Sequence, residues 1–402
     1  MPSVETAARP MMRRTLLRVL VPALLTVGLI PMAMADERWG TPIVESVPTP
    51  SPPSVGAPSH LLVDMHSGYI LAHRDPEESW EPASLAKIMT AYVVFEELAS
   101  GHIGLEDKVT VSEKAWRSSG SRMFLEVGTE VTVAELLQGL IVQSGNDAAV
   151  ALAEHVAGDE ETFAQVMNQY ASRLGMDNTH YTNATGMPHE QMRTTAQDTA
   201  RLARAMIDDF PEFYDWYSQR SFEYAGINQH NRNRLLWRDE TVDGLKTGYT
   251  SSAGYNLVTS AERGGMRLIS VVLGTESEDA RAQQSLQLLN YGFRFFETHR
   301  LYSAGEQLTE ARAWMGEGDS VALGIPDNLY VTIPRQEYDN LSASVSVDGQ
   351  IRAPVEAGAK LGTLKIELAG SVIHEEPLIA MEDVAEGGLW RRMIDQVWLR
   401  FE

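Results

Sequence analysis

The sequence predicts an α/β (α+β) fold followed by a small all-β sandwich domain. The chain has 402 residues, more than one ordinary domain, and 44% of them are hydrophobic, which is enough to form a core. Between residues 59 and 300, long apolar helical segments alternate with short strands. From residue 301 to residue 386, short β-rich runs alternate with Gly, Pro and Asp turns and show little helical periodicity.

The first 35 residues (1–35) are predicted to be a signal peptide rather than part of the fold. Arg13 and Arg14 form a basic start, and an apolar run extends from residue 16 to about residue 34. The A-x-A sequence that ends at Ala35 is typical of a cleavage site and indicates an exported protein. The alternative is an uncleaved membrane anchor.

Residues 36–58 are rich in proline and polar side chains. Such a segment does not supply a core, so we interpret it as a linker or extended arm. Residues 60–72 then contain two apolar runs around a polar turn at 64–68, which is typical of a β-hairpin.

The segment 84–100 is apolar, long and free of Gly and Pro, so it predicts a buried helix. Pro82 precedes it and Gly101 follows it, as is common at the two ends of a helix. The other elements predicted before residue 301 are two helices within 133–155 that break near 144–146, helices at 195–208 and 282–298, and strands at 256–261 and 267–274.

Two kinds of segment are predicted after residue 300. The β domain at 301–386 contains strands near 330–333, 341–347 and 361–368. Residues 387–402 form an amphipathic helix whose apolar face carries tryptophan and whose polar face carries arginine, which suits a membrane-anchoring helix. The alternative is an ordinary helix packed on the β domain.

The composition excludes several function classes. A formal net charge of −22 repels phosphates, so no nucleic-acid partner is expected. The chain has no cysteine, which excludes disulfides, thiol nucleophiles and thiolate metal ligands. The histidines lack metal-ligand spacing, and we expect neither a metal nor another cofactor. With only six lysines in the chain, each lysine within a motif carries more weight.

Ser84 and Lys87 form an S-x-x-K motif at the start of the predicted buried helix. The i, i+3 spacing places both side chains on one face of the helix, one turn apart. A buried lysine can be neutral and can then take the proton of a serine hydroxyl. The alternative is a plain helix start followed by a solvated lysine.

Two further motifs follow. Ser144-Gly145-Asn146 lies at the predicted helix break, where a hydroxyl and an amide can face one cavity. The commoner meaning of this sequence is a helix N-cap or turn.

Lys246-Thr247-Gly248 precedes the predicted strand pair. Its lysine and threonine could bind a carboxylate, and its glycine allows close approach of a substrate backbone. The alternative is a hairpin edge with a solvated lysine.

In this order, the three motifs resemble the S-x-x-K, S-x-N and K-T-G set of penicillin-binding proteins and serine β-lactamases. Residues 62–90, 135–149 and 243–274 are similar at greater length to the low-molecular-mass D-alanyl-D-alanine carboxypeptidase family. The resemblance implies a β-lactamase/transpeptidase-like catalytic domain at 59–300, with an antiparallel sheet flanked by helices. The β domain and the terminal helix also fit the layout of that family.

The resemblance also implies roles for catalytic residues. Ser84 would be the acylated nucleophile and Lys87 its general base. Ser144 and Asn146 would transfer a proton and hold the substrate amide, and Lys246 would polarise that site.

Four further residues would bind the substrate. Thr247 would hold its terminal carboxylate beside Gly248, and the backbone N–H of Tyr249, with that of the nucleophile, would form an oxyanion hole. Arg281 matches the carboxylate-binding arginine of the family, and its planar fork suits a carboxylate. The alternative for Arg281 is a surface arginine beside two acidic residues.

The function implied is that of a serine-type D-Ala-D-Ala carboxypeptidase that removes the terminal D-Ala from peptidoglycan pentapeptide stems. β-lactams are expected to acylate the same serine as covalent inhibitors. The protein is expected at the periplasmic face of the inner membrane, where the C-terminal helix would contact the membrane surface. The alternatives are a serine β-lactamase, a D,D-endopeptidase, and a catalytically silent wall-binding protein.

Overall fold

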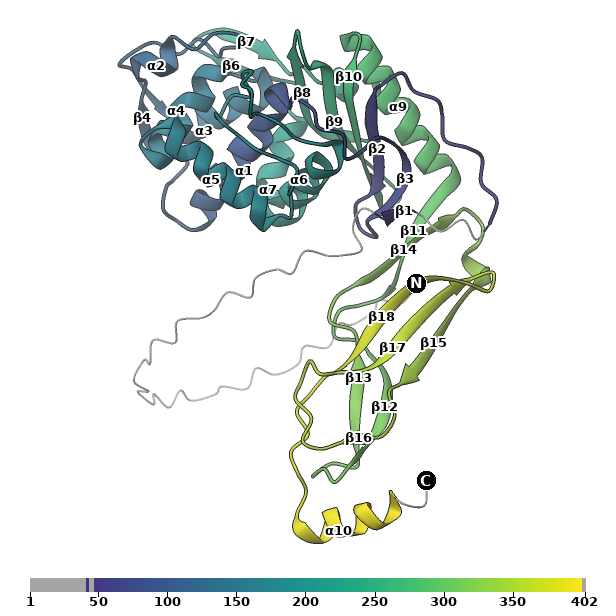
Figure 1. Cartoon of the computed structure of the whole chain (residues 1–402). Helices are drawn as coiled ribbons and strands as arrows, with labels where there is room; N and C mark the ends of the chain where they lie inside the picture. The colour runs from purple at the N-terminus through teal and green to yellow at the C-terminus, as the bar shows by residue number, and fades with distance from the viewer. Residues whose placement is uncertain (1–40, 43–46, 400–402) are drawn as a thin grey trace, which may run out of the picture. The chain divides into compact units, whose positions relative to one another are not determined.

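The computed structural model describes residues 41–42 and 47–399 (Figure 1). The predicted signal peptide lies outside the described residues, as do much of the predicted linker and residues 400–402 at the end of the predicted terminal helix.

A six-stranded sheet forms the centre of the N-terminal part of the chain, in the order β1-β3-β2-β10-β9-β8. Its strand pairs are antiparallel, except that the two-residue strand β1 pairs in parallel with β3. Strand β8 lies at one edge of the sheet. The strands are β1 (Thr41–Pro42), β2 (Ser59–Asp64), β3 (Tyr69–Arg74), β8 (Val242–Thr250), β9 (Gly254–Arg263) and β10 (Met266–Thr275).

Helices cover both faces of this sheet, as Figure 1 shows. Because side chains alternate along a strand, Leu61 and Val63 join the cluster under helices α1 to α6, while Leu62 joins the cluster under α9. The helices are α1 (Ala86–Ala99), α2 (Glu113–Trp116), α3 (Val133–Gln138), α4 (Asn146–Ala157), α5 (Glu160–Arg173), α6 (Ala196–Asp209), α7 (Pro211–Tyr214), α8 (Leu235–Arg238) and α9 (Glu278–Phe295). Two hairpins lie among them, β4 (Lys108–Thr110) with β5 (Glu130–Thr132) and β6 (Ser221–Tyr224) with β7 (Ile227–His230).

The predicted hairpin, the long helix, the helix break and the strand pair after the K-T-G motif are confirmed. The K-T-G motif itself lies inside a further strand, β8, which the sequence did not predict. Two glycines give this segment a weak strand signal, and its pairing with β9 overrides that local preference. Helix α9 also begins earlier than expected because Ser277 caps it, and it ends earlier because Phe296 starts strand β11.

The proline-rich segment contributes to the core, contrary to the prediction from its composition. Val55 and Ala57 are buried in the same cluster as α9. The backbone N–H of Ala57 donates to Gln284 Oε1 at 2.7 Å, and Tyr291 donates from its hydroxyl to the carbonyl of Pro50 at 2.9 Å. An extended chain without a core of its own therefore packs along α9.

The C-terminal part consists of β strands, as predicted. A six-stranded sheet in the order β15-β17-β18-β13-β12-β16 and a two-stranded sheet β11-β14 share a core in which Val331 and Ile333 cluster with Leu364 and Ile366. The strands are β11 (Phe296–Tyr302), β12 (Gln307–Trp314), β13 (Ser320–Gly324), β14 (Leu329–Pro334), β15 (Leu341–Val347), β16 (Ile351–Arg352), β17 (Lys360–Leu368) and β18 (Ser371–Ala380).

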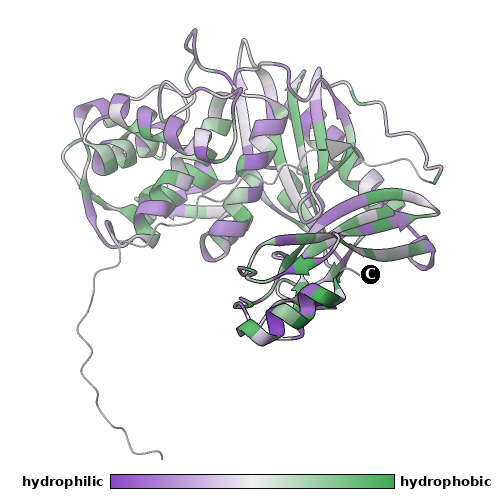
Figure 2. Cartoon of the chain, turned by 60° about the horizontal axis from the view of Figure 1, so that its bottom comes forward, coloured by the Kyte–Doolittle hydropathy of each residue, from purple (hydrophilic) through white to green (hydrophobic). Residues whose placement is uncertain are grey.

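Helix α10 (Leu389–Trp398) contacts the β strands through its polar side. Asp395 is buried and accepts a hydrogen bond from the backbone N–H of Met315 at 2.7 Å. Trp390, Met393 and Val397 are exposed, so the apolar face of α10 is not packed against the β domain (Figure 2). Within the described residues, no helix has both the length and the apolar character needed to span a bilayer.

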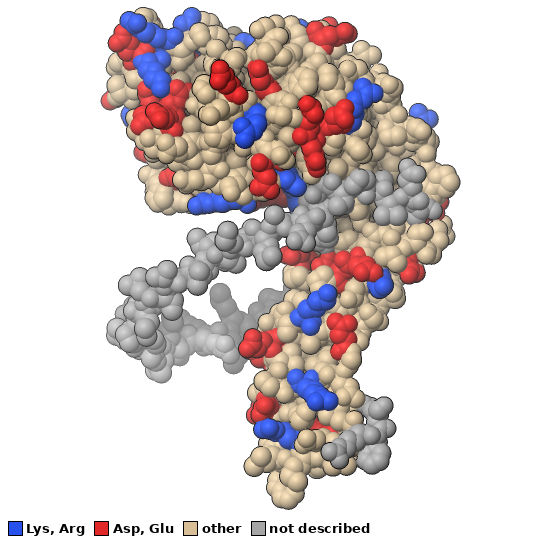
Figure 3. All heavy atoms as spheres, viewed as in Figure 1, with Lys and Arg blue, Asp and Glu red and all other residues tan. Residues whose placement is uncertain are grey.

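The acidic excess of the chain is not gathered into one patch on the face drawn in Figure 3, where acidic and basic side chains are interspersed.

Candidate active site

Ser84 lies on a tight turn that leads directly into helix α1. The 3-10 turn spans Ala83–Leu85, and Ala83 has a positive φ of 49°, a strained conformation for a residue with a Cβ. The nitrogen Lys87 Nζ lies 3.0 Å from Ser84 Oγ, within reach of the hydroxyl proton, and donates to the carbonyl of Thr185 at 2.6 Å. The predicted i, i+3 pairing is therefore present, and the alternative of a solvated lysine is wrong.

Burial keeps Lys87 ready to act as a base. Its side chain is only 1% exposed, and this desolvation, with the charge of Arg232 as the second cause, lowers the pKa of Lys87 to about 7. A large fraction of Lys87 is therefore neutral at physiological pH, as proton abstraction from a serine requires.

The rate of D-Ala release is expected to depend on the protonation of Lys87. Because the base must be neutral, kcat/KM should fall about tenfold for each pH unit below about 7 and level off above it. A pH profile of kcat/KM checks this, provided that the protein is shown to remain folded at each pH. A flat profile from about pH 5 to about pH 8 would show that Lys87 is not the base.

Ser144 and Asn146 lie where the helical segment breaks. Ser144 adopts a left-handed conformation with φ of 64°, between a π-helical turn (Gly139–Gln143) and α4. Its Oγ atom is buried and has no hydrogen-bond partner among the described residues, and the same holds for Asn146 Oδ1. Asn146 Nδ2 donates to the carbonyl of Ser119 at 2.6 Å, which fixes the amide. A free hydroxyl and a free amide oxygen thus face the pocket, as a substrate amide would require.

The neighbouring Asp147 holds the wall of the pocket in place. Its carboxylate accepts hydrogen bonds from the backbone N–H groups of Met123, Phe124 and Leu125 at 2.9, 2.9 and 3.1 Å. This clamp fixes the loop in which Ser121 lines the pocket, so Asp147 has a structural role.

Lys246 is buried beside the first lysine. Desolvation, followed by the charge of Lys87, lowers the pKa of Lys246 well below its usual value. Lys246 makes no ion pair with a carboxylate among the described residues, so two buried amines lie next to one reaction site.

Gly248 allows strand β8 to pass against the nucleophile turn. A Cβ at this position would lie 2.9 Å from the carbonyl oxygen of Pro82 and 3.3 Å from the backbone nitrogen of Ser84. The edge strand and the amide of Ser84 are therefore close neighbours, and the glycine is required by that approach.

The variant Gly248→Ala is expected to lower kcat/KM for D-Ala release about 10- to 100-fold, because the added methyl group displaces β8 from Ser84. The control Gly104→Ala places its Cβ at an ordinary 3.4 Å contact and should leave the rate unchanged. Steady-state kinetics of both purified variants would test this. Equal rates for both would mean that the close approach of β8 is not needed.

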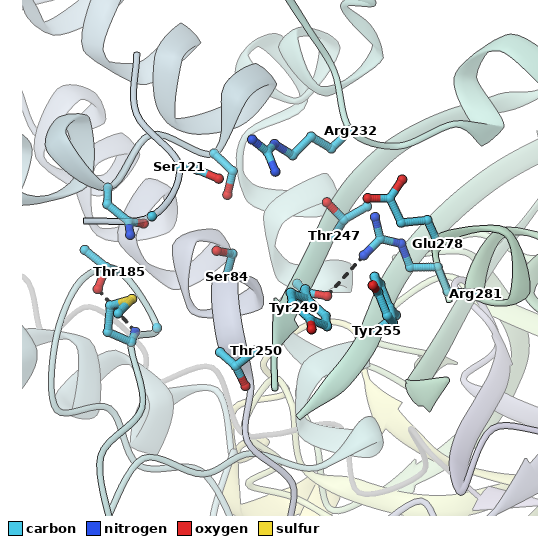
Figure 4. Close-up of a pocket in the computed structure, with 16 residues that line it drawn as sticks. Ser84, Ser121, Thr185, Arg232, Thr247, Tyr249, Thr250, Tyr255, Glu278 and Arg281 are labelled. Atoms are coloured by element: carbon cyan, nitrogen blue, oxygen red, sulfur yellow. Dashed lines mark hydrogen bonds between the residues drawn. The ribbon is translucent and has the colours of Figure 1, made fainter. Parts of the chain in front are cut away.

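Arg281 reaches from α9 to the same part of β8, at Gly248. It is 5% exposed, and its NH1 group donates to the carbonyl of Gly248 at 3.2 Å, so the alternative of a free surface arginine is wrong. Burial lowers the pKa of Arg281 to about 10, which leaves it charged at neutral pH. In Figure 4, Thr247 and Arg281 point toward the same space. A hydroxyl and a guanidinium placed in this way suit a carboxylate.

One pocket of about 460 Å³ gathers most of the predicted site. It is lined by Ser84, Ser144, Asn146, Thr247, Gly248, Tyr249 and Arg281, while Lys87 and Lys246 are buried and do not line it. Tyr249 is exposed and its ring packs 4.3 Å from that of Tyr255 at the rim. Sequence reasoning missed Gly120, Ser121, Thr185, Arg232 and Tyr255, which also line the pocket.

Arg232 is the most informative of the missed residues. It is exposed, lines the pocket, and has no ion pair or hydrogen bond among the described residues. Its charge contributes to the lowered pKa of Lys87, Lys246 and Arg281, so it lies near all three. Its only signal in the sequence is a short run of alternating Asn and Arg, which is not distinctive.

Among residues 41–42 and 47–399, no group of three or more histidine, aspartate or glutamate side chains could hold a metal ion. The pocket is lined by hydroxyl, amide and guanidinium groups and by the carboxylate of Glu278.

The fold is an antiparallel sheet flanked by helices. Its pocket holds a Ser–Lys pair, a second serine and, at one end, cationic side chains. These features together define a serine hydrolase of the acyl-enzyme class. Residues 46–277 match the family model described as D-alanyl-D-alanine carboxypeptidase, and residues 296–386 match that of the C-terminal domain of penicillin-binding protein 5. The chain belongs to the D-alanyl-D-alanine carboxypeptidase family and is a serine-type D-Ala-D-Ala carboxypeptidase.

Three relatives illustrate this. The chain is 44% identical over 357 residues to D-alanyl-D-alanine carboxypeptidase DacC of Escherichia coli (strain K12), covering 87% of this chain and 89% of the relative. The crystal structure of penicillin binding protein 5 from Haemophilus influenzae matches with a TM-score of 0.82 and 41% identity, covering 84% of this chain and 100% of that chain. Penicillin binding protein 6B from Escherichia coli matches with a TM-score of 0.72 and 35% identity, covering 85% and 100%. The predicted fold class and carboxypeptidase activity are confirmed, and the alternative functions are not favoured.

Proposed function

We propose that this carboxypeptidase removes the terminal D-Ala from peptidoglycan pentapeptide stems through an acyl-enzyme on Ser84. The observation that carries the proposal is the position of Lys87 Nζ, 3.0 Å from Ser84 Oγ, beside a pocket whose other end presents Thr247 and Arg281. The names of the relatives support the substrate, because they are D-alanyl-D-alanine carboxypeptidases.

In the first step, the terminal carboxylate of the substrate binds to Thr247 and Arg281, with Arg232 as a further cation. Ser84 Oγ attacks the carbonyl carbon of the penultimate D-Ala while Lys87 takes the hydroxyl proton. The backbone N–H groups of Ser84 and Tyr249 stabilise the oxyanion. The C–N bond then breaks, and the leaving amine receives a proton through Ser144.

In the second step, water attacks the ester carbonyl of the acyl-enzyme. Lys87, again neutral, takes a proton from this water. The proton then returns to Ser84 Oγ as the C–O bond breaks. Asn146 holds the amide of the bound stem, and Lys246 polarises the site formed by Ser144 and Asn146.

Release of D-Ala from a synthetic peptide ending in D-Ala-D-Ala tests this proposal. We expect turnover of the D,D-peptide and none of the matched peptide ending in L-Ala, because the carboxylate and the scissile carbonyl must reach their partners together. Failure to release D-Ala by correctly folded protein would overturn the proposal.

We also propose that β-lactams acylate Ser84 and are released slowly, since relatives carry the name penicillin-binding protein. With nitrocefin, this predicts colour development limited to about one equivalent of protein. Rapid multiple turnover would favour the serine β-lactamase alternative instead.

The protein is further proposed to be exported through its signal peptide and to act at the periplasmic face of the inner membrane. The exposed Trp390, Met393 and Val397 on α10, together with Asp395 docked against the β strands, support contact of the apolar face with lipid.

Deleting residues 387–402 is expected to leave D-Ala release from soluble peptides unchanged and to move the protein from the membrane fraction to the soluble fraction. Sedimentation of membranes from expressing cells measures this. Within the helix, Trp390→Asp should have the same effect, whereas Arg392→Ser on the other face should not. A truncated protein that still sediments with membranes would exclude α10 as the anchor.

A further inference from the structure

Asn256 lies on strand β9 close to the nucleophile turn, and no step of the proposed reaction uses it. Its side chain is fully buried, with 0% exposed. A buried amide needs hydrogen-bond partners, because leaving its polar atoms unpaired costs free energy. The partners of Asn256 lie on other segments of the chain, so they show which segments this residue connects.

The nitrogen of the Asn256 amide binds the segment that leads into the nucleophile turn. Nδ2 donates to the carbonyl of Glu81 at 3.1 Å and makes a second, longer contact of 3.5 Å with the carbonyl of Pro82. Pro82 directly precedes the 3-10 turn Ala83–Leu85 that carries Ser84. The side chain of Asn256 therefore holds the chain immediately before the nucleophile turn.

The oxygen of the Asn256 amide fixes the direction in which the amide points. Oδ1 accepts a hydrogen bond from the backbone N–H of Gly274 at 2.8 Å. Gly274 lies on β10, which is the neighbour of β9 on the side away from β8. Because an N–H group can only donate, the amide oxygen must face β10 and the amide nitrogen must face the turn. The sheet therefore orients the group that holds the turn.

The backbone of Asn256 pairs with a third segment, the strand that carries the K-T-G motif. Strands β8 and β9 lie side by side (Figure 1), and Asn256 stands opposite Gly248 in their antiparallel ladder. Tyr249, whose N–H group would contribute to the oxyanion hole, directly follows Gly248. Asn256 thus joins β8, through its backbone, to the turn that carries Ser84, through its side chain.

The nucleophile turn depends on such contacts because it is strained. Ala83 has a positive φ of 49°, which a residue with a Cβ rarely adopts. The turn is also closely packed, since a Cβ at Gly186 would overlap the carbonyl oxygen of Ala83. A strained conformation persists only where the surrounding structure holds it, and Asn256 binds the chain directly ahead of the strained residue.

We propose that Asn256 is a positioning residue that sets the separation between the two N–H groups of the oxyanion hole, those of Ser84 and Tyr249. This inference rests on the proposed function, because it uses the acyl-enzyme at Ser84. The two N–H groups belong to segments far apart in the sequence, and Asn256 binds both segments. Asn256 does not line the pocket, so it acts through the placement of these donors. Such donors stabilise an oxyanion only when they are correctly placed.

The test uses the full-length protein with Asn256→Asp, a change of the same size that keeps the acceptor for Gly274 but replaces the donor to Glu81 by an oxygen. Its matched control is Asn168→Asp, because Asn168 also binds one carbonyl and one N–H group of the backbone. Asn168 Nδ2 donates to the carbonyl of Tyr181 at 2.8 Å, and its Oδ1 accepts from the N–H of Tyr181 at 2.8 Å. Asn168 does not line the pocket. Asn256→Leu provides a second, uncharged variant if the buried carboxylate prevents folding.

Three quantities are compared: kcat/KM for D-Ala release, inhibition by a peptide boronic acid, and binding of the D,D-peptide in a Ser84→Ala background. The boronic acid forms a tetrahedral adduct with a serine hydroxyl and so mimics the charged intermediate. We expect Asn256→Asp to weaken both catalysis and boronate inhibition roughly 10- to 100-fold, and to change peptide binding by less than about twofold. Asn168→Asp should change none of the three.

Three outcomes would overturn the inference while wild type still releases D-Ala, so that the proposed function stands. The first is a folded Asn256 variant whose kcat/KM stays within about twofold of wild type. The second is boronate inhibition that is unchanged while catalysis falls. The third is a loss of peptide binding as large as the loss of kcat/KM, because the whole pocket would then have shifted. Wild type that does not release D-Ala would instead count against the proposed function itself.

Discussion

Ser84→Ala is expected to reduce D-Ala release roughly 10⁵-fold or more, because the variant lacks the hydroxyl that forms the ester. The variant should fold normally, since Lys87 is the one hydrogen-bond partner of the Ser84 hydroxyl among the described residues and Lys87 keeps its bond to Thr185. Binding of the peptide should persist, because Thr247 and Arg281 are untouched. Enzyme kinetics and a binding measurement with the same peptide separate the two effects.

The control for this variant is Ser218→Ala, which removes an exposed hydroxyl from a turn outside the pocket. It should retain the wild-type rate. If Ser84→Ala still released D-Ala at a rate near that of the control, the assignment of the nucleophile would be wrong.

Lys87→Met is expected to lower kcat about 10³-fold with little change in binding, because a thioether fills similar space but cannot accept a proton. The control Lys108→Met removes an exposed lysine and should leave kcat unchanged. Partial activity restored by an added small amine would support the role of Lys87 as base. Near-wild-type kcat for Lys87→Met would refute it.

The same variant has a stability consequence whose sign follows from burial. The pKa of Lys87 is about 7 in the folded chain and 10.5 for the free side chain, so the unfolded state binds more protons between these values. The free energy of unfolding of wild type therefore gains a contribution as the pH rises from about 7 to about 10.5. Relative to wild type, Lys87→Met should thus be most stable below about pH 7 and lose that advantage above it. Thermal unfolding of both proteins across this range measures the difference.

The sequence predicted those parts of the site that depend on local spacing. Ser84 and Lys87 lie one turn apart because a helix places i and i+3 on one face, and the break at Ser144 was visible in the interrupted helical pattern. The hairpin at 60–72 followed from two apolar runs around a polar turn.

Contacts between distant segments could not be predicted in this way. The strand character of Lys246 and Thr247 comes from pairing with β9, and the position of Arg232 comes from the turn after β7. The clamp from Asp147 to the loop at 123–125 joins residues more than 20 positions apart, and no periodicity records it. These features depend on tertiary structure, which overrides local preference.

Helix α10 likewise has one feature that the sequence predicted and one that depends on a tertiary contact. The apolar face of α10 followed from its sequence, but the buried contact of Asp395 with the backbone of Met315 did not. That contact turns the polar side toward the β strands, and so determines which face the helix exposes.

Mass spectrometry of the protein after incubation with benzylpenicillin tests the central claim most directly. The account predicts one covalent adduct per chain, located on the peptide that contains Ser84 and absent from Ser84→Ala. An adduct on a different residue, or none at all with folded protein, would contradict the acyl-enzyme at Ser84.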